Sequence, residues 1–516
     1  MLAIVQRFHS IISPLSCIFS DPAPVPVPEL PRKPPPLPDL PLEIWLEIFQ
    51  FATYVHQNVT IKPLDPFTPK RTTTNAMGAN TPALAMRTKL VLVLVSKAWR
   101  SVALQMLYEH ITIRSPARAN SILQVLEQSR RPQPTSGTVE TPGPGYGQWT
   151  RHIEVFTFAR GAGSINYLQV IFKILRLCPK LRILSGKWIH PLPIEFLHAV
   201  SGVLSPSLSE LYWNEMKEHG DLNTTTTPSF LGSFNALRVL DLRHFVGTDP
   251  LTWTEISTRP VLPLVRDLIL STHPRSLEVA TMLSLPSLRN LTLRTPSWDS
   301  FKSETLLNLF LKAHGTSLLA IDLPTPAADA EPDPDNAIAR RTATHINPDV
   351  FLAPDLCPNL ESFTFPITSP SLAPHIHPNL RRIGLRGANS DSLYPDKPSS
   401  VKGLLMAIDI EKYPKLELIQ TVGFLPEAHG DSVIKDVFIW WAERFETMGV
   451  TFVDGEGVMW AYYAEPVPEE KQKPPPSESL VKAPSEKALL GLKDKEHKRH
   501  KPEDVVTQSP PSTPKL

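Results

Sequence analysis

The sequence has few cysteines, no long apolar run and almost no net charge. Its three cysteines, Cys17, Cys178 and Cys357, lie far apart. That spacing excludes a disulfide framework and zinc-ligand pairs, and favours a reducing compartment, the cytoplasm or the nucleus. The longest aliphatic run, 90–95, falls far short of the roughly 20 residues that span a bilayer, so we expect no membrane segment. The net charge of +1 gives no indication of nucleic-acid binding.

The sequence also lacks the motifs of common catalytic sites. It contains no Gly-x-Ser-x-Gly nucleophile, no HExxH and no Walker lysine. We therefore expect a protein that is not an enzyme and needs neither a metal nor a cofactor. His375 and His377 are expected at the surface, and residues 454–457 are expected to form a turn.

Proline, in contrast, is abundant, with 56 residues against a usual share of about 5%. Together with polar residues it marks segments that cannot bury enough apolar area to fold. We predict disorder in the N-terminal segment 1–36 and in the tail 464–516, in which no aromatic residue occurs. Two inserts, 57–88 and 324–348, are predicted to be disordered as well, and 114–148 is predicted to be a linker.

The region 149–463 contains a repeated pattern, apolar-x-x-apolar-x-apolar, in nine copies, of which the first and the last keep only the first two apolar positions. Successive copies begin 20 to 42 residues apart, and seven have a proline two residues before the first apolar position. The first positions are Leu181, Leu208, Leu237, Val265, Leu288, Leu318, Leu360, Leu380 and Leu416.

This pattern predicts an α/β fold in which each copy contributes one strand. One copy alone buries too little surface, so the copies are expected to stack into a parallel sheet with helices on its other face. The spacing is typical of leucine-rich repeats, and we predict a leucine-rich-repeat-like solenoid over 149–463. An ordinary α/β domain with alternating strands and helices is the alternative.

Two apolar blocks precede the repeats. Residues 40–52 form an expected helix whose polar residues Glu43, Glu47 and Gln50 occupy one narrow stripe, which leaves much apolar surface for a partner. Residues 89–113 form the second block. Val95, Trp99 and further residues at helical spacing favour a helix there.

Together the two blocks resemble the F-box, a short helical motif, over 37–113 with an inserted loop at 57–88. The match comprises Leu-Pro-x-Glu-Ile at 40–44, Ile-Phe at 48–49, an aliphatic run, Trp99 and the Leu-Tyr pair at 107–108, with Ser96 in place of the usual Cys. The resemblance is greatest to fungal F-box proteins. It implies docking on a Skp adaptor, and through it on a cullin ubiquitin ligase. The residues that it implies for this contact are Leu40, Pro41, Ile44, Ile48, Val95 and Trp99.

In F-box proteins of this kind the C-terminal repeats recruit a protein substrate, so the resemblance implies a substrate-receptor adaptor. The strand residues that flank the repeat leucines are expected to line the recognition face, and they carry both charge signs. They are Asp241, Arg243, Asp267, Thr292, Arg294, Asp322, Arg382 and Arg386. The alternative is a repeat scaffold with an F-box-like segment that does not dock.

Overall fold

The computed structural model describes most of the chain between residues 40 and 461. The described residues are 40–53, 65–67, 81–130, 145–156, 164–188, 192–215, 228–243, 259–271, 273–294, 304–323, 346–353, 355–367, 369, 372, 375–396, 400–424, 426 and 432–461. All of them belong to one unit, Met1–Ala461. The predicted disordered segments 1–36 and 464–516 lie outside the described residues, as do most of the two predicted inserts.

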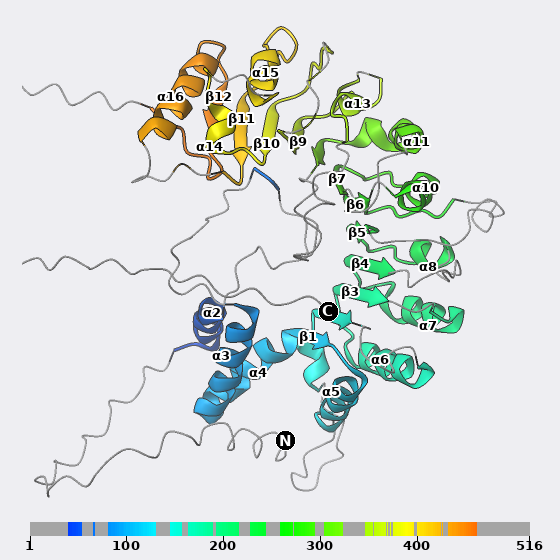
Figure 1. Ribbon diagram of the computed structural model, residues 1–516. Helices are drawn as coiled ribbons and strands as arrows, with labels where there is room; N and C mark the ends of the chain where they lie inside the picture. Colours follow the sequence, from blue (N-terminus) through cyan, green and yellow to red (C-terminus); the bar gives the residue numbers. More distant parts are fainter. Residues whose placement is uncertain are drawn as a thin grey trace, which may run out of the picture. The chain divides into compact units, whose positions relative to one another are not determined.

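A parallel sheet of twelve strands organises this unit, and its strands follow one another in the order of the sequence (Figure 1). The strands are β1 (His110–Ile113), β2 (His152–Phe156), β3 (Ile183–Trp188), β4 (Glu210–Glu215), β5 (Val239–Asp241), β6 (Asp267–Ser271), β7 (Asn290–Arg294), β8 (Ala320–Asp322), β9 (Ser362–Pro366), β10 (Arg382–Arg386), β11 (Leu418–Val422) and β12 (Thr451–Val453).

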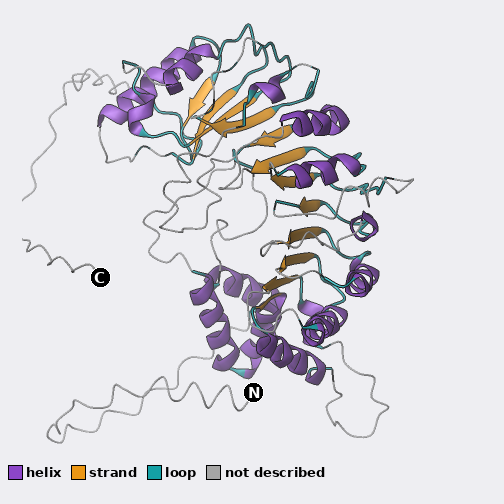
Figure 2. Ribbon diagram, turned by 45° about the vertical axis from the view of Figure 1, so that its right-hand side comes forward, coloured by secondary structure: helices purple, strands orange, loops and turns teal. Residues whose placement is uncertain are grey.

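In the described residues, helices connect most consecutive strands and cover one face of the sheet, although none lies between β5 and β6 or between β9 and β10 (Figure 2). Those after β1 are α5 (Pro116–Gln128), η2 (Tyr146–Trp149), α6 (Ile165–Leu177), α7 (Ile194–Leu204), α8 (Pro228–Gly232), α10 (Pro274–Met282), α11 (Glu304–His314), η3 (Gly315–Ser317), α13 (Asp349–Leu352), α14 (Ser390–Leu393), α15 (Ser400–Ala407) and α16 (Ser432–Glu446). Among the described residues, three helices precede the sheet: α2 (Leu42–Ala52), α3 (Pro82–Val95) and α4 (Lys97–Glu109).

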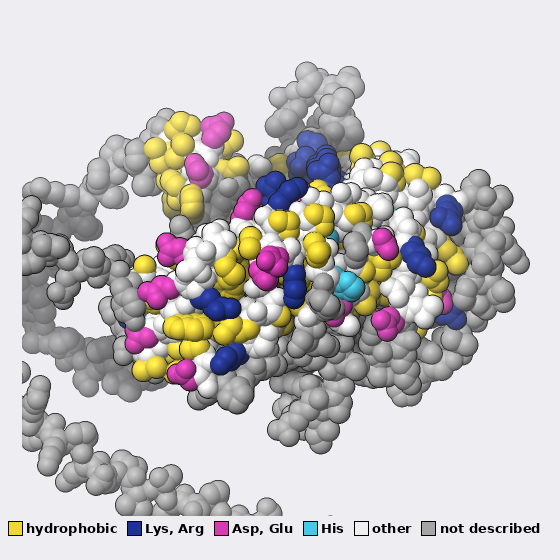
Figure 3. All heavy atoms as spheres, turned by 90° about the horizontal axis from the view of Figure 1, so that it is seen from above, with side chains coloured by type: hydrophobic (Ala, Val, Ile, Leu, Met, Phe, Trp, Pro, Cys, Tyr) yellow, Lys and Arg dark blue, Asp and Glu magenta, His cyan; other side chains and the backbone are white. Residues whose placement is uncertain are grey.

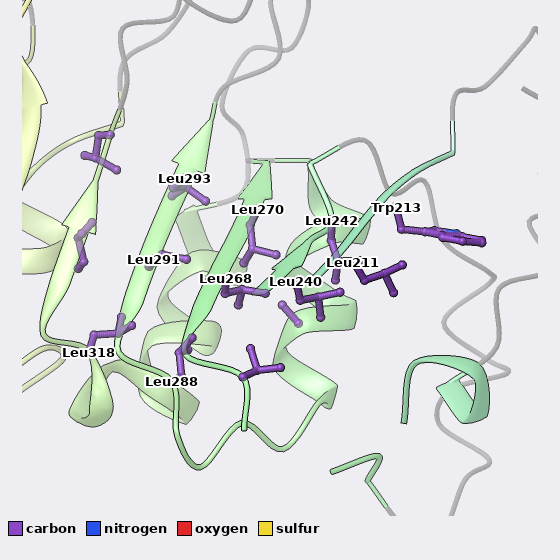
Figure 4. Packing of buried hydrophobic residues seen from close by; sticks show 14 of the residues in the cluster. Leu211, Trp213, Leu240, Leu242, Leu268, Leu270, Leu288, Leu291, Leu293 and Leu318 are labelled. Atoms are coloured by element: carbon purple, nitrogen blue, oxygen red, sulfur yellow. The ribbon is translucent and has the colours of Figure 1, made fainter. Parts of the chain in front are cut away.

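The core under the sheet consists of the repeated apolar residues. Every one of the nine predicted copies coincides with a strand that starts two residues after its first apolar position. The fourth positions of adjacent copies pair directly, as Leu240, Leu268 and Leu291 do across β5 to β7 (Figure 4). These leucines are at most 1% exposed. The prediction of a parallel sheet built from this pattern is confirmed.

In four of the copies, the proline two residues before the first apolar position lies in a tight turn closed by a backbone hydrogen bond. In the two Leu-Cys-Pro copies, the carbonyl of Cys178 accepts from the Leu181 N–H at 3.1 Å, and that of Cys357 from the Leu360 N–H at 3.2 Å. Proline thus occupies the second position of a four-residue turn, which its fixed φ favours. The proline therefore helps to reverse the chain into the next strand.

Both cysteine turns also press against a glycine of the preceding 3-10 helix. A Cβ on Gly147 would lie 2.0 Å from the Leu177 carbonyl oxygen, and a Cβ on Gly315 would lie 2.1 Å from that of Leu356. No side chain fits at such a distance, so glycine is required there by space rather than by backbone conformation.

Two predicted boundaries are wrong. Helix α3 begins at Pro82, so residues 82–88 are not part of a loop. The predicted linker 114–148 contains α5, and β1 already pairs with β2, so the sheet begins at residue 110 instead of 149. Both helices start with a Ser or Thr cap followed by proline, a start signal that the composition of these segments masked.

The expectation for His377 is also wrong, whereas the turn at 454–457 is confirmed. His377 is fully buried, and its Nε2 lies 2.9 Å from the carbonyl oxygen of Cys357. The reason is its place directly before the proline of a repeat turn, a position that points into the core. At 454–457 the backbone turns about Asp454, whose carboxylate accepts from the Glu456 and Val458 N–H groups.

Candidate functional site

Helices α2, α3 and α4 form a small helical unit with a core of its own. Phe49 of α2 is 1% exposed, and its ring centroid lies 5.0 Å from that of Trp99 on α4. Trp45 completes the cluster, 5.1 Å from Trp99 and 5.8 Å from Phe49. Aromatic rings at these distances and tilts attract one another and fix how the helices cross.

Ser96 separates α3 from α4. Its backbone is extended, and its hydroxyl accepts from the Trp99 N–H at 3.1 Å, so it caps the start of α4. A capping serine contributes about 1 kcal/mol to helix stability. Ser96 therefore ends one helix and starts the next, in the position where the F-box pattern usually has cysteine.

The outer side of α2 is apolar and open to solvent. Ile44, Ile48 and Phe51 follow one another at i, i+4 and i+7, and their exposed fractions are 41%, 42% and 75%. This spacing places all three on one stripe, on the side of the helix away from Phe49.

Helix α3 carries a second apolar stripe, formed by Leu84, Val91 and Val95 at i, i+7 and i+11, with Leu94 beside it at 77% exposed. Helices α2 and α3 are in contact. Of the 20 large hydrophobic side chains exposed in the described residues, nine belong to these two helices. They are Leu42, Ile44, Ile48, Phe51, Leu84, Leu90, Val91, Leu94 and Val95. We call this set the α2–α3 face; by helical spacing, Leu42 lies outside the stripe of α2 and Leu90 outside that of α3.

The structure separates the predicted adaptor-binding residues into two groups. Ile44, Ile48 and Val95 belong to the α2–α3 face, and Leu40 and Pro41 stand at its N-terminal end. Trp99 instead packs inside the helical unit and is only partly exposed. Leu84 was missed because the start of this helix was assigned to a loop, whereas Leu90, Val91 and Leu94 lie in the predicted block 89–113 but were not among the residues that the resemblance implied. The Thr81-Pro82 cap would have located it.

No linker separates the helical unit from the sheet in the described residues, because α4 runs directly into β1. The Tyr108 ring stacks on Tyr146 at 4.8 Å, and Tyr146 stacks on Trp149 at 5.6 Å. The Thr150 hydroxyl donates to the Tyr108 carbonyl at 2.9 Å. Burial, together with the neighbouring Tyr146, raises the pKa of Tyr108 to about 12. These contacts fix the helical unit to the first strands of the sheet.

The face of the sheet opposite the helices carries the predicted substrate-binding residues, several of them engaged with one another. Arg243 holds the fully buried Asp241 through two nitrogens, with Nη2 at 2.7 Å from Oδ2. Arg386 on β10 reaches across β9 to Asp322 on β8, with Nε and Nη2 each 2.9 Å from a carboxylate oxygen. The first pair lies within one segment at the end of β5, and the second links two strands that are separated by one other strand.

The remaining predicted residues lie on the same face. Asp267 accepts from the Asn290 side-chain amide at 2.6 Å, and Thr292 is 8% exposed. Arg382 is 40% exposed and donates from Nε to the Ser362 hydroxyl at 2.8 Å. Arg294 is the last residue of β7 and pairs with Ser271 of β6. Arg382 is thus the most accessible cation whose surroundings the structure describes in this set.

A cavity of about 160 Å³ opens on this face over strands β6 to β10. Asp267, Thr292, Asp322, Thr364 and Arg382 line it, so four of the eight predicted substrate-binding residues surround one space. Thr364, which the sequence did not single out, is fully buried. In the described part of the chain, its hydroxyl has no hydrogen-bond partner. We call this space the inner-face cavity.

Other site classes find no support among the described residues. No three His, Cys, Asp or Glu side chains there come together as metal ligands would. No helix among them is long and apolar enough to cross a membrane. On the face of the molecule drawn in Figure 3, basic and acidic side chains are interspersed, unlike the mainly basic stripe of a nucleic-acid interface.

A comparison with known protein families found no family that matches this chain, and no curated protein matches its sequence.

Proposed function

We propose that this protein is a substrate-receptor adaptor of a cullin ubiquitin ligase, with an F-box formed by α2, α3 and α4 that binds a Skp adaptor. The α2–α3 face is the observation that carries the proposal. It concentrates nine exposed hydrophobic side chains on two short helices, which is far from the scattered distribution that monomeric surfaces normally have. The Leu-Pro-x-Glu-Ile pattern at the start of α2, which resembles the F-box, is the reason for proposing a Skp adaptor as the partner.

In this proposal the sheet and its helices form a leucine-rich-repeat-like solenoid that recruits a protein substrate. The sequential strand order and the shared turn proline support that interpretation. The protein itself supplies no catalytic group. It acts by raising the local concentration of the substrate near a ubiquitin-charged enzyme, in the cytoplasm or the nucleus.

The contacts between α4 and the first strands give this mechanism a physical basis. Because Tyr108, Tyr146 and Trp149 pack together and α4 continues into β1, the adaptor-binding face and the sheet cannot move independently on a flexible tether. A substrate on the sheet is then held at a set distance from the ligase, which favours repeated ubiquitin transfer. The alternative is a repeat scaffold whose helical unit docks no Skp adaptor.

The experiment is a pull-down of the full chain with a purified Skp adaptor. Ile48→Glu and Val91→Glu each place a charge in the α2–α3 face, and each should weaken capture at least tenfold. A tenfold loss is about 1.4 kcal/mol, which is less than a typical buried hot spot provides. Leu309→Glu is the matched control, because Leu309 is 48% exposed on α11, far from this face in the sequence.

The control should bind as the wild type does. Circular dichroism should show that all three variants are folded. A wild-type chain that captures no Skp adaptor would refute the adaptor proposal and leave the scaffold. Capture that survives both charge substitutions would show that docking uses another surface.

A further inference from the structure

A three-residue segment from the insertion between α2 and α3 lies against the inner-face cavity. It consists of Asp65, Pro66 and Phe67, and is the short blue segment beside β10 in Figure 1. The Asp65 carboxylate lies 3.8 Å from the Arg382 guanidinium, and the guanidinium carbon lies 4.8 Å from the centre of the Phe67 ring. One arginine therefore contacts an acidic and an aromatic side chain two residues apart.

The segment is folded to present these two groups together. The Phe67 N–H donates to Asp65 Oδ1 at 3.0 Å, which forms a small turn about Pro66. Pro66 and Phe67 are partly buried, although their segment precedes the strands that they touch by more than 200 residues. A planar guanidinium suits this pair, because it bonds a carboxylate at its edge and attracts a ring at its face.

The segment does not fill the space beside it. The inner-face cavity retains about 160 Å³ between Phe67 and the strands, and the Thr364 hydroxyl in its wall is buried without a partner among the described residues. Buried polar groups are normally hydrogen-bonded. The cavity is therefore better suited to a longer or differently shaped ligand than to the three residues that now touch it.

We propose that the inner-face cavity is the peptide-recognition site of this protein, and that Asp65-Pro66-Phe67 occupies it as an internal ligand. The external ligand is a protein segment with an acidic residue two positions before an aromatic one. This inference rests on the proposed function, because it names the chemistry of the substrate that the sheet recruits. The acidic residue pairs with Arg382, the ring packs on its guanidinium, and a further polar group reaches Thr364.

The charges of the cavity limit what it accepts. Asp322 is neutralised by Arg386, and Asp267 already accepts from Asn290, so Arg382 is the cation left for a ligand carboxylate. A peptide with several acidic residues would meet the carboxylate of Asp267, which no cation neutralises among the described contacts, and is disfavoured. Since both contacts of Arg382 to the segment are partly exposed to water, each is weak, and an external peptide can displace the segment.

Because the segment is part of the same chain, an external ligand must exceed a minimum affinity to displace it. A covalently linked ligand has an effective concentration in the millimolar range, so a weak internal contact still shields the site from weak external ligands. Removing the two contact side chains of the segment should therefore expose the site without altering its walls.

The test uses the full chain and a fluorescent synthetic peptide of its own residues 61–70, IKPLDPFTPK, with anisotropy as the readout. The double variant Asp65→Ala/Phe67→Ala should bind this peptide at least tenfold more tightly than the wild-type chain. Adding Arg382→Glu to that double variant should abolish binding. Adding Arg381→Glu instead is the matched control, because Arg381 pairs with Glu417 and does not line the cavity.

Each result decides a separate point. A double variant that does not bind the peptide overturns the recognition site. Equal binding by the wild type and the double variant overturns the internal ligand. Equal loss in the Arg381 and Arg382 variants shows a general charge effect and also overturns the site. Skp capture is measured on the same proteins, so that peptide binding without capture refutes the ligase function alone, and capture without peptide binding refutes this inference alone.

Discussion

Replacing Gly315 by alanine tests whether the cysteine turns are as tightly packed as their geometry requires. The added methyl carbon would lie 2.1 Å from the Leu356 carbonyl oxygen, about 1 Å closer than a carbon and an oxygen normally approach. The turn resists movement, because the adjacent Cys357 carbonyl accepts from Leu360 and also lies within hydrogen-bonding distance of the His377 ring. Overpacking of this kind costs about 1–3 kcal/mol, and we expect the upper end here.

Gly202 provides the matched control, because an alanine there has open space. It lies within α7, and a Cβ at this position meets no atom within 4 Å. The same substitution should therefore raise the free energy of unfolding by about 0.5–1 kcal/mol, through the helix propensity of alanine. Urea unfolding followed by tryptophan fluorescence measures both variants. If Gly315→Ala unfolds at the same urea concentration as the wild type, the packing argument for the cysteine turns is wrong.

Two further predictions concern titrating groups. Burial lowers the pKa of His314 and His377, so each binds a proton less readily in the folded chain than in the unfolded chain, whose histidines titrate near a pH of about 6.5. The free energy of unfolding should therefore fall as the pH drops from 7.5 to 5.5, by up to about 1.4 kcal/mol per pH unit for each histidine. His377→Gln should reduce this dependence on pH. An unchanged dependence would assign the effect to other groups. Burial raises the pKa of Cys178 to about 11 and that of Cys357 to about 12. Neither should react with iodoacetamide at pH 8 until urea is added, and peptide mass spectrometry would reveal labelling of the folded protein that contradicts this.

The strands could be predicted from the sequence because a single physical rule repeats. Three apolar residues at fixed spacing must be buried together, and in seven of the nine copies a proline two residues earlier marks where the strand begins. The strands β5 and β8 lack that proline but were predicted from their three apolar residues alone, whereas β1, β2 and β12 also lack it and were not predicted. Their apolar residues, such as Ile111 and Ile153, nevertheless pair in the same column as those of the other strands.

The candidate sites could be predicted only in part. Periodicity identified the apolar stripe of α2, because helical spacing alone decides which residues share a face. It did not reveal that Arg386 reaches Asp322 across an intervening strand, or that Asp65 and Phe67 meet Arg382. Such contacts depend on how residues far apart in the sequence come together, and no local pattern records this.

The sequential order of the twelve strands also has a kinetic consequence. Each strand pairs only with its immediate neighbours in the chain, so no strand depends on a partner synthesised hundreds of residues later. Closing each pair costs the entropy of one short loop, and the sheet can grow one strand at a time. We expect the N-terminal strands to be folded on α4 while the ribosome is still making the C-terminal ones. Unfolding should begin at an end of the sheet, and stable shorter intermediates would replace a single cooperative transition.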